Sequence, residues 1–209
     1  MKTPSKTYLH VPHGRFLIRF IVVVLLLACS SAVCILDQRR TQSEMGAILS
    51  AFFSDQVLHD LRYWPAGREI QIVLLREPQS GPFPGGRSLL FDPRSSFSQS
   101  SRTTRASFFL SNVFSTNIGT ELHLPGRTQA FFINRKEVQG TKPIDFQTNF
   151  PNNFGYFAVS HIGLNPSKTE AVLYVDHFCG GLCGGGGYFL MRKVNGVWHV
   201  VDQHNTWMA

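Results

Sequence analysis

Apolar residues between Thr41 and Tyr63 recur three and four positions apart, and polar residues fill the positions between them. This spacing gathers the apolar side chains on one side of a helix, so the segment predicts a long amphipathic helix. Ser43 is a suitable N-cap, and Pro65 provides a stop, because proline disfavours the helical conformation in the residue before it. The apolar positions are Met45, Ile48, Leu49, Phe52, Phe53, Val57, Leu58 and Leu61.

The middle of the chain alternates between short apolar runs and polar connections. Glu69–Arg76 and Gln129–Ile133 predict strands. Ala106–Ile118 returns to helical spacing before Gly119, a suitable C-terminal cap, and predicts a helix, although the same residues could form a strand. Ile144–Phe150 predicts a single helical turn or a loop.

Pro78–Arg105 differs from its neighbours in composition, because it is rich in proline, glycine, serine and arginine. The segment is too polar and too interrupted for a regular element, so it predicts a long loop. Loops of this length are usually functional or disordered.

Four strand-like runs close the chain, and the turn between the last two is the clearest local signal. Asn195-Gly196 lies between apolar residues, and both residues tolerate the left-handed conformations of a type I′ turn, so the pair predicts a β-hairpin. Helices first and strands last indicate an α+β domain with a mainly antiparallel sheet that ends in a four-strand meander. The four runs are Tyr156–Leu164, Glu170–Phe178, Tyr188–Val194 and Val197–Asp202.

The closing hairpin also predicts a register between its two strands. If Val194 pairs with Val197, the facing residues are Lys193 with Trp198, Met191 with Val200 and Leu190 with Val201. Both faces of this hairpin are partly apolar. We therefore expect the hairpin to lie in the interior of the sheet.

The N-terminal run Phe20–Leu36 carries no charge. A run of this length cannot be a solvated surface, so we expect it to enter a membrane. The positive-inside rule keeps basic flanks in the cytoplasm, and the residues upstream of the run include Lys2, Lys6, Arg15 and Arg19. The rest of the chain is therefore expected outside the cytoplasm, in the periplasm or at the cell surface.

Three fates of this run stay open. A retained transmembrane signal-anchor fits its length, since a spanning helix needs about 17 to 25 mainly apolar residues. A cleaved signal peptide, which would release a secreted protein, has a shorter apolar core, and Ala32-Val33-Cys34 is a poor cleavage site. Leu26-Leu27-Ala28-Cys29 resembles a bacterial lipobox, with Cys29 as the lipidated residue. We favour retention, in which Cys29 and Cys34 are small apolar residues of a membrane helix.

The formal net charge of +7 lies mostly in this leader. Residues 1–40 hold six of the 20 lysines and arginines and one of the 13 acidic residues, which leaves 14 basic and 12 acidic residues, or +2, for 41–209. No cluster of basic residues interleaved with aromatics follows, so we expect no nucleic-acid partner. About 170 residues suit one domain, so the predicted division is a leader and anchor at 1–40 and a single extracytoplasmic domain at 41–209.

Cys179 and Cys183 are the two cysteines outside the leader. Export places them where thiols become oxidised, and the Gly-Gly-Leu between them is flexible enough to allow bridging, so the pair predicts a disulfide. Closing so small a loop stabilises the fold by on the order of 2 kcal/mol or less. A redox catalyst fits less well, because dithiol catalysts use Cys-x-x-Cys at a helix N-terminus.

Three residues are candidates for ligand binding: Asp176 and His177, which lie close to the cysteines, and the more distant His161. Alternation along a strand puts Asp176 and His177 on opposite faces, so at most one of them joins the sulfurs, and no second Cys/His pair completes a four-ligand site. We therefore expect no metal and no cofactor.

The glycine run Gly184–Gly187 is followed by a strand-like segment and not by a helix, which disfavours a phosphate-binding loop. It predicts either a wide hairpin connection or glycines required where a backbone or an aromatic ring packs closely. Ser160-His161 is no catalytic dyad, because adjacent strand residues point to opposite faces. No known hydrolase motif appears, so no catalytic residue is assigned.

The C-terminal part resembles a group of uncharacterised bacterial exported proteins, which share Ser-x-x-Gly-Phe-Asn, Ala-Leu-Val-Tyr-Val, a Cys-Gly or glycine-rich loop, Tyr-x-Leu-Leu and Gly-x-Trp. The resemblance implies a bacterial, extracytoplasmic protein and transfers no catalytic residue. The closing Asn-Gly-x-Trp-x-Val hairpin is also similar to the end of nuclear-transport-factor-2-like folds, which implies a cone-like sheet behind a long helix. The matching segments are Ser160–Asn165, Glu170–Val175, Cys179–Leu190 and Gly196–Trp198.

The anchor, the aromatic-rich sheet and the lack of a recognisable catalytic set predict a membrane-anchored, non-catalytic binding or envelope-associated module outside the cytoplasm. The alternative is an enzyme, either a thiol–disulfide catalyst or a metal-dependent hydrolase, that uses Cys179 and Cys183 with His177 or His161. The sequence identifies neither the ligand nor a protein partner.

Overall fold

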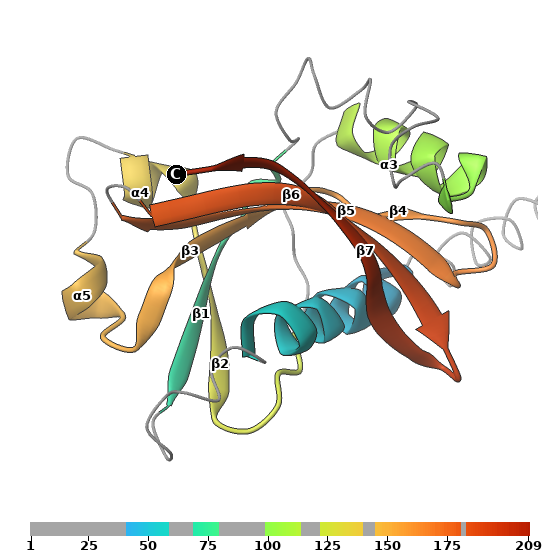
Figure 1. Ribbon diagram of the computed structural model, residues 1–209. Helices are drawn as coiled ribbons and strands as arrows, with labels where there is room; N and C mark the ends of the chain where they lie inside the picture. Colours follow the sequence, from blue (N-terminus) through green and yellow to red (C-terminus); the bar gives the residue numbers. More distant parts are fainter. Residues whose placement is uncertain (1–40, 59–68, 80–98, 114–121, 140–144, 181–182) are drawn as a thin grey trace, which may run out of the picture. The chain divides into compact units, whose positions relative to one another are not determined.

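The computed structural model describes residues 41–58, 69–79, 99–113, 122–139, 145–180 and 183–209, of which Ser43–Ala209 belong to one compact unit. This unit has an α+β fold, in which helices cover both faces of a mixed sheet of seven strands (Figure 1). The predicted α+β class is therefore confirmed. The predicted anchor at Phe20–Leu36 and the lipidation candidate Cys29 lie outside the described residues. Among the helices that the structure describes, none is long and apolar enough to cross a membrane.

The sheet has the strand order β2-β1-β3-β5-β6-β7, and the short β4 pairs with β5. β1 runs parallel to both of its neighbours, whereas β3, β5, β6 and β7 follow one another antiparallel. The antiparallel end predicted from the sequence is thus confirmed. The strands are β1 (Ile70–Leu75), β2 (Thr128–Ile133), β3 (Asn153–Val159), β4 (Gly163–Leu164), β5 (Glu170–Gly180), β6 (Cys183–Val194) and β7 (Val197–Met208).

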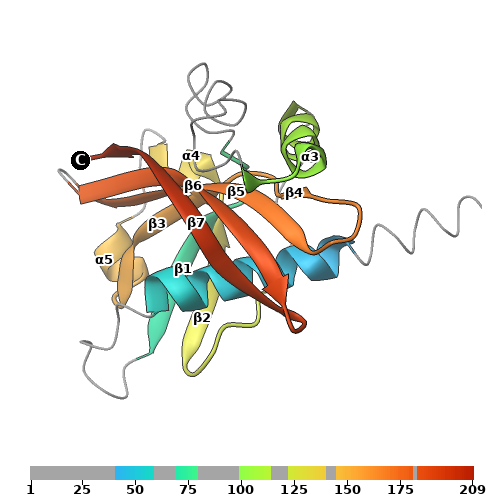
Figure 2. The ribbon, with the colours of Figure 1, turned by 45° about the vertical axis from the view of Figure 1, so that its right-hand side comes forward.

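The helix at 41–58 covers the first face of the sheet, along which it lies in Figures 1 and 2. It is α-helical to residue 52 and continues as the π-helix η1 (Phe53–Leu58). The predicted amphipathic pattern is confirmed, because its buried residues Ile48, Leu49, Phe52 and Phe53 pack on inward residues of β1, β3, β5 and β6. Ser43 lies inside the helix, so its assignment as the N-cap was wrong.

The second face of the sheet is covered in two places. Phe108 of α3 (Arg102–Val113) packs on Tyr174 and Tyr188, and a methyl group on Gly163 would overlap the backbone of Phe108. The predicted helix is therefore confirmed, with a start four residues earlier than its apolar spacing indicated. The other part of this face lies against the short helices α4 (Arg135–Gln139) and α5 (Phe146–Asn149), the second of which is the predicted single turn.

Glu170 fastens α3 to the sheet. Its carboxylate accepts hydrogen bonds from the Ser101 backbone N–H at 2.6 Å and from the Thr104 hydroxyl at 2.7 Å, and it pairs with Arg192 at 3.3 Å. Burial alone would raise the pKa of Glu170, but these hydrogen bonds outweigh burial and hold the pKa below its usual range. The carboxylate therefore stays charged and supplies a fixed acceptor for the first turn of α3.

The β6–β7 hairpin holds the start of the helix at 41–58 in a similar way. Glu44 accepts hydrogen bonds from the Lys193 ammonium at 2.6 Å and from the Trp198 indole N–H at 3.0 Å. Lys193 also lies over the Trp198 ring, 5.0 Å from its centroid. These contacts tie the two strands to the helix that lies under them.

The type I′ turn of this hairpin is confirmed, since Asn195 and Gly196 have φ values of 51° and 83°. Lys193 pairs with Trp198 and Met191 with Val200, as predicted. Leu190, however, pairs with Asp202 and not with Val201. The register shifts there because Val201 is an extra residue in β7, a β-bulge that the predicted register did not include.

The position of the hairpin also differs from the prediction. β6 is an interior strand, but β7 lies at the edge of the sheet and is the last strand in the strand order. A second register shift makes Thr206 another extra residue of β7. The apolar residues that suggested an interior position include Val194, Val197 and Val201, which are exposed.

Candidate ligand-binding site

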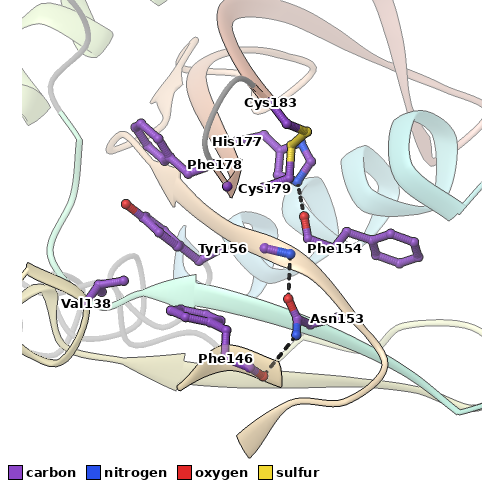
Figure 3. Close-up of a pocket in the computed structure, with 11 residues that line it drawn as sticks. Val138, Phe146, Asn153, Phe154, Tyr156, His177, Phe178, Cys179 and Cys183 are labelled. Atoms are coloured by element: carbon purple, nitrogen blue, oxygen red, sulfur yellow. Dashed lines mark hydrogen bonds between the residues drawn. A yellow bond between two sulfur atoms is a disulfide. The ribbon is translucent and has the colours of Figure 1, made fainter. Parts of the chain in front are cut away.

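Two cavities adjoin at the end of the sheet where β5 turns into β6. The aromatic cavity has a volume of about 590 Å³, and its walls include Val138, Phe146, Phe154, Tyr156 and Phe178 (Figure 3). The glycine cavity, of about 640 Å³, has walls that include Phe52, Phe157, Val175, Gly185, Phe189 and Asn205. His177, Cys179 and Cys183 line both cavities. Cavities of this size with mainly apolar walls are typical of small-molecule sites.

The predicted disulfide closes the tip of this hairpin. Cys179 and Cys183 are bonded, with their Cα atoms 5.2 Å apart. The β5–β6 ladder ends at the pair of Gly180 and Cys183, and Gly180 takes the positive φ of 107° that glycine accommodates. A methyl group on Gly155 of β3 would lie 2.6 Å from the Cys179 Cα atom, so β3 packs directly against the tip. Cys183 is exposed and Cys179 half-buried, which leaves the bond accessible.

His177 is held in one orientation. Its ring stacks on Phe157 with centroids 4.3 Å apart and planes 9° from parallel, and its Nε2 lies 2.6 Å from the carbonyl oxygen of Phe154 (Figure 3). Burial lowers the pKa of His177 more than this hydrogen bond raises it, so the ring is neutral at physiological pH. The structure thus places a fixed, uncharged imidazole in the wall that the two cavities share.

A row of stacked rings forms one wall of the aromatic cavity. Tyr156 lies between Phe146, at 5.5 Å, and Phe178, at 4.9 Å, and both pairs are stacked. Trp207 continues the row beyond Phe178 at 5.5 Å. The Tyr156 hydroxyl points to the Gln139 side chain, with which it forms a hydrogen bond. The wall therefore combines residues from α5, β3 and β5 that contact one another, and Trp207 of β7, which lines the glycine cavity, packs against the end of the row.

Asn153 supports the same cavity from the start of β3. Its side-chain oxygen accepts the Gly155 N–H, and its amide nitrogen donates to the carbonyl oxygen of Phe146 (Figure 3). The amide nitrogen also donates to the carbonyl oxygen of Phe150. These bonds fix the corner between α5 and β3. Both ends of the amide are engaged inside the protein, so the side chain orients the wall.

Asp176 faces away from His177, as strand alternation predicted, and it lines neither cavity. It is 3% exposed, and its Oδ1 accepts the Tyr174 hydroxyl at 2.6 Å and the Trp207 indole N–H at 2.7 Å. The Gln79 side chain forms a further hydrogen bond with it. Burial raises the pKa of Asp176 despite these donors. Asp176 therefore ties β5 to β7 from within the protein.

The glycine run lies inside β6 and is no hairpin connection, so the first of the two predicted explanations was wrong. The second is confirmed, because rings pack directly on these glycines. A methyl group on Gly184 would lie 3.1 Å from the Trp207 ring, and one on Gly186 would lie 2.6 Å from the Tyr174 hydroxyl and closer still to Asp176 and Trp207. The absence of a side chain at Gly186 leaves room for the hydrogen-bonded groups of Asp176, Tyr174 and Trp207.

His161 lies apart from the other two candidate residues and lines neither cavity. It follows β3, where its backbone N–H donates to the Asn112 side chain of α3 at 2.9 Å. The Ser160 hydroxyl donates to the carbonyl oxygen of His161, so this pair forms no dyad, as predicted. No group of three or more His, Cys, Asp or Glu in the described part of the chain is arranged to hold a metal ion.

Of the three ligand-binding candidates, the structure places one, His177, in the cavity walls, and the sequence analysis missed the aromatic wall. A signal for the wall was present in Phe154-Gly155-Tyr156-Phe157, where alternate aromatic residues face opposite sides of a strand. Comparison of the chain with models of known protein families, with curated proteins and with solved structures finds no match. The resemblance to bacterial exported proteins therefore stays a prediction.

Proposed function

We propose that this protein is a non-catalytic binding module that takes up a small, mainly apolar ligand at the disulfide-closed end of its sheet. The aromatic cavity carries the proposal, because its volume of about 590 Å³ and its apolar walls suit a small organic molecule. Residues whose own hydrogen bonds are satisfied inside the protein hold these walls in place. A preformed cavity of this kind loses little conformational entropy when a ligand enters.

We further propose that the domain works outside the cytoplasm and is held at the membrane by Phe20–Leu36. The accessible Cys179–Cys183 bond supports this location, because disulfides persist in oxidising compartments and are rare in the cytosol. The basic flank of the leader supports the orientation.

Filling the aromatic cavity tests the proposal. Val138 lines the cavity from α4, whereas Lys136 is exposed on the same helix. Val138→Trp should lower the amount of small molecule that copurifies with the full chain by about tenfold or more, which corresponds to at least 1.4 kcal/mol of binding. Lys136→Trp should leave it unchanged. Solvent extraction of the purified chains followed by mass spectrometry measures the ligand, and unchanged occupancy in Val138→Trp would contradict the proposal.

The second candidate is an enzyme, and one observation favours it: the accessible disulfide and a neutral histidine line the same cavities. Thiol titration with mass spectrometry separates the two candidates. We expect the chain isolated from its own compartment to have Cys179 and Cys183 fully oxidised and no bound metal. A substantial reduced fraction, or turnover of a dithiol substrate that is lost in Cys179→Ser, would favour the enzyme.

A further inference from the structure

The tip of the β6–β7 hairpin presents apolar side chains to its surroundings. All four residues of this tip, Val194–Val197, are exposed, and the two valines that flank the turn are 51% and 56% exposed. The valines pair across the hairpin, so strand alternation places both side chains on the same face. Trp198, the next residue of β7, faces the other way and is buried. The tip therefore carries two adjacent valines that the fold leaves uncovered.

This tip lies beside the start of the helix at 41–58 (Figures 1 and 2). Lys193 and Trp198, the residues on either side of the tip, both donate to the carboxylate of Glu44, at 2.6 and 3.0 Å. Glu44 follows Thr41 by three positions, or about 5 Å along the helix axis. The hairpin tip and the first turn of this helix thus occupy the same end of the domain.

The proposed anchor ends close to this point in the chain. Four residues, 37–40, join Leu36 to the helix that begins at Thr41. Even fully extended, this connection reaches at most about 18 Å, whereas a strand of twelve residues such as β7 is about 40 Å long. With Phe20–Leu36 in the bilayer, the end of the domain that carries the hairpin tip is therefore the end nearest the membrane.

We propose that the hairpin tip inserts Val194 and Val197 into the surface of the lipid bilayer, as a second membrane contact besides the anchor. This inference rests on the proposed anchoring, and it adds the orientation of the domain. Valine side chains gain free energy on transfer from water to an apolar medium, and the polar turn between them suits the headgroup region. None of the four tip residues is charged, so their insertion buries no charge.

This orientation determines how a ligand reaches the cavities. Cys183, which lines both cavities, begins β6, and Val194 ends it. The two residues are roughly 35 Å apart along the twelve-residue strand. The cavities therefore lie at the end of the domain away from the bilayer, and their ligand enters from the aqueous compartment and not sideways from the lipid.

Photocrosslinking tests the orientation. The probe p-benzoylphenylalanine is placed at Val197 in the full chain, which is reconstituted in vesicles of phosphatidylethanolamine and phosphatidylglycerol. Met208 provides the matched control, because it is also exposed on β7 but lies at the other end of the strand. Mass spectrometry should find lipid adducts of the probe at Val197 and none at Met208. Equal lipid adducts at the two positions, or protein adducts in place of lipid at Val197, would overturn the membrane contact.

A charge at the tip tests whether the valines drive the contact. With the probe at Val197, Val194→Asp should lower the yield of lipid adducts about fivefold, because the transfer of a half-exposed valine side chain is lost. Val201→Asp, at an exposed valine further along β7, should leave the yield unchanged. Equal effects of the two substitutions would contradict a role of the tip valines.

A further measurement needs no variant. In the wild-type chain with ¹³C-methyl-labelled valine, vesicle lipids that carry a nitroxide should broaden the methyl signals of Val194 and Val197 more than that of Val201. Equal broadening would count against insertion of the tip.

A probe at Val24, in the leader, separates this inference from the proposed anchoring. Lipid adducts at Val24 without any at Val197 would refute the hairpin contact and leave the anchor standing. If the probe at Val24 forms no lipid adduct, the proposed anchoring itself fails.

Discussion

Replacing Gly186 by alanine should lower the free energy of unfolding by about 3 to 5 kcal/mol, because it combines overpacking with the loss of a buried hydrogen-bond network. The added methyl group would lie 2.6 Å from the Tyr174 hydroxyl and closer still to Asp176 and Trp207. These three polar groups bond to one another above the glycine, so they cannot move apart without breaking contacts at 2.6 and 2.7 Å. No flexible side-chain end is available to give way.

Gly185 supplies the matched control for this substitution. A methyl group there would meet the Trp207 carbonyl oxygen at 3.4 Å and Met208 at 3.6 Å, which are ordinary contacts. Gly185→Ala should therefore change the unfolding free energy by less than about 1 kcal/mol, a range that includes stabilisation through the stiffer unfolded chain. Denaturant unfolding of both variants provides the measurement. Equal effects at the two positions would show that Gly186 is not required by the network.

Removing the carboxylate of Asp176 should have the second large effect. Asp176→Ala leaves the Tyr174 hydroxyl and the Trp207 indole N–H buried without their acceptor. Each of the two unsatisfied groups costs about 1 to 3 kcal/mol, so the expected loss is about 2 to 6 kcal/mol. Asp176→Asn keeps an acceptor oxygen in place and should lose much less.

Comparing the wild type with Asp176→Asn, which cannot titrate at this position, also shows how the ionisation of Asp176 affects stability. Burial raises the pKa of this carboxyl in the folded protein, so its contribution to stability is fully present below the pKa of the unfolded chain and is lost as pH rises through the folded pKa. The wild type should therefore lose stability relative to Asp176→Asn as pH rises from about 4. Denaturant unfolding of both chains between pH 4 and pH 8 measures this, and a constant difference would refute the raised pKa.

Local signals in the sequence predicted most of the elements but not how they pair. The strand at β1 was correctly predicted, yet nothing local shows that it runs parallel to both β2 and β3. Pairing of this kind depends on connections that bring distant segments together, which short-range patterns do not encode. Ile72, Val73, Leu74 and Leu75 are buried on both faces of the sheet. A continuous apolar run of this kind is typical of parallel strands, but it does not identify the neighbouring strands.

The C-terminal hairpin shows that local signals predict a turn better than they predict the register of the strands it joins. Its turn was predictable because Asn195 and Gly196 determine their own backbone conformations. The register held for Lys193 and Met191 but failed at Leu190, since an extra residue in one strand has no signature in residue type. Apolar residues on both faces wrongly suggested an interior strand, because valine is common in strands whether or not its side chain is buried, and Val194, Val197 and Val201 are exposed.

The sequence predicted only those parts of the candidate site that can be recognised from the type of a single residue, such as a cysteine or a histidine. The two cysteines are four positions apart and their bond was predictable, and His177 was named because it lies close to them in the sequence. The aromatic wall joins Phe146, Tyr156 and Phe178 from three elements, so it exists only after folding. Asp176 was a good candidate by type, but tertiary contacts turned it toward the interior of the protein.

The two bulges of β7 should hinder aggregation between copies of this protein at high local concentration. An edge strand of twelve residues would be a template on which another chain could add a strand and begin a fibril. The extra residues Val201 and Thr206 break that template into short lengths and twist them away from a common plane. Many copies can then share a confined surface without stacking edge to edge.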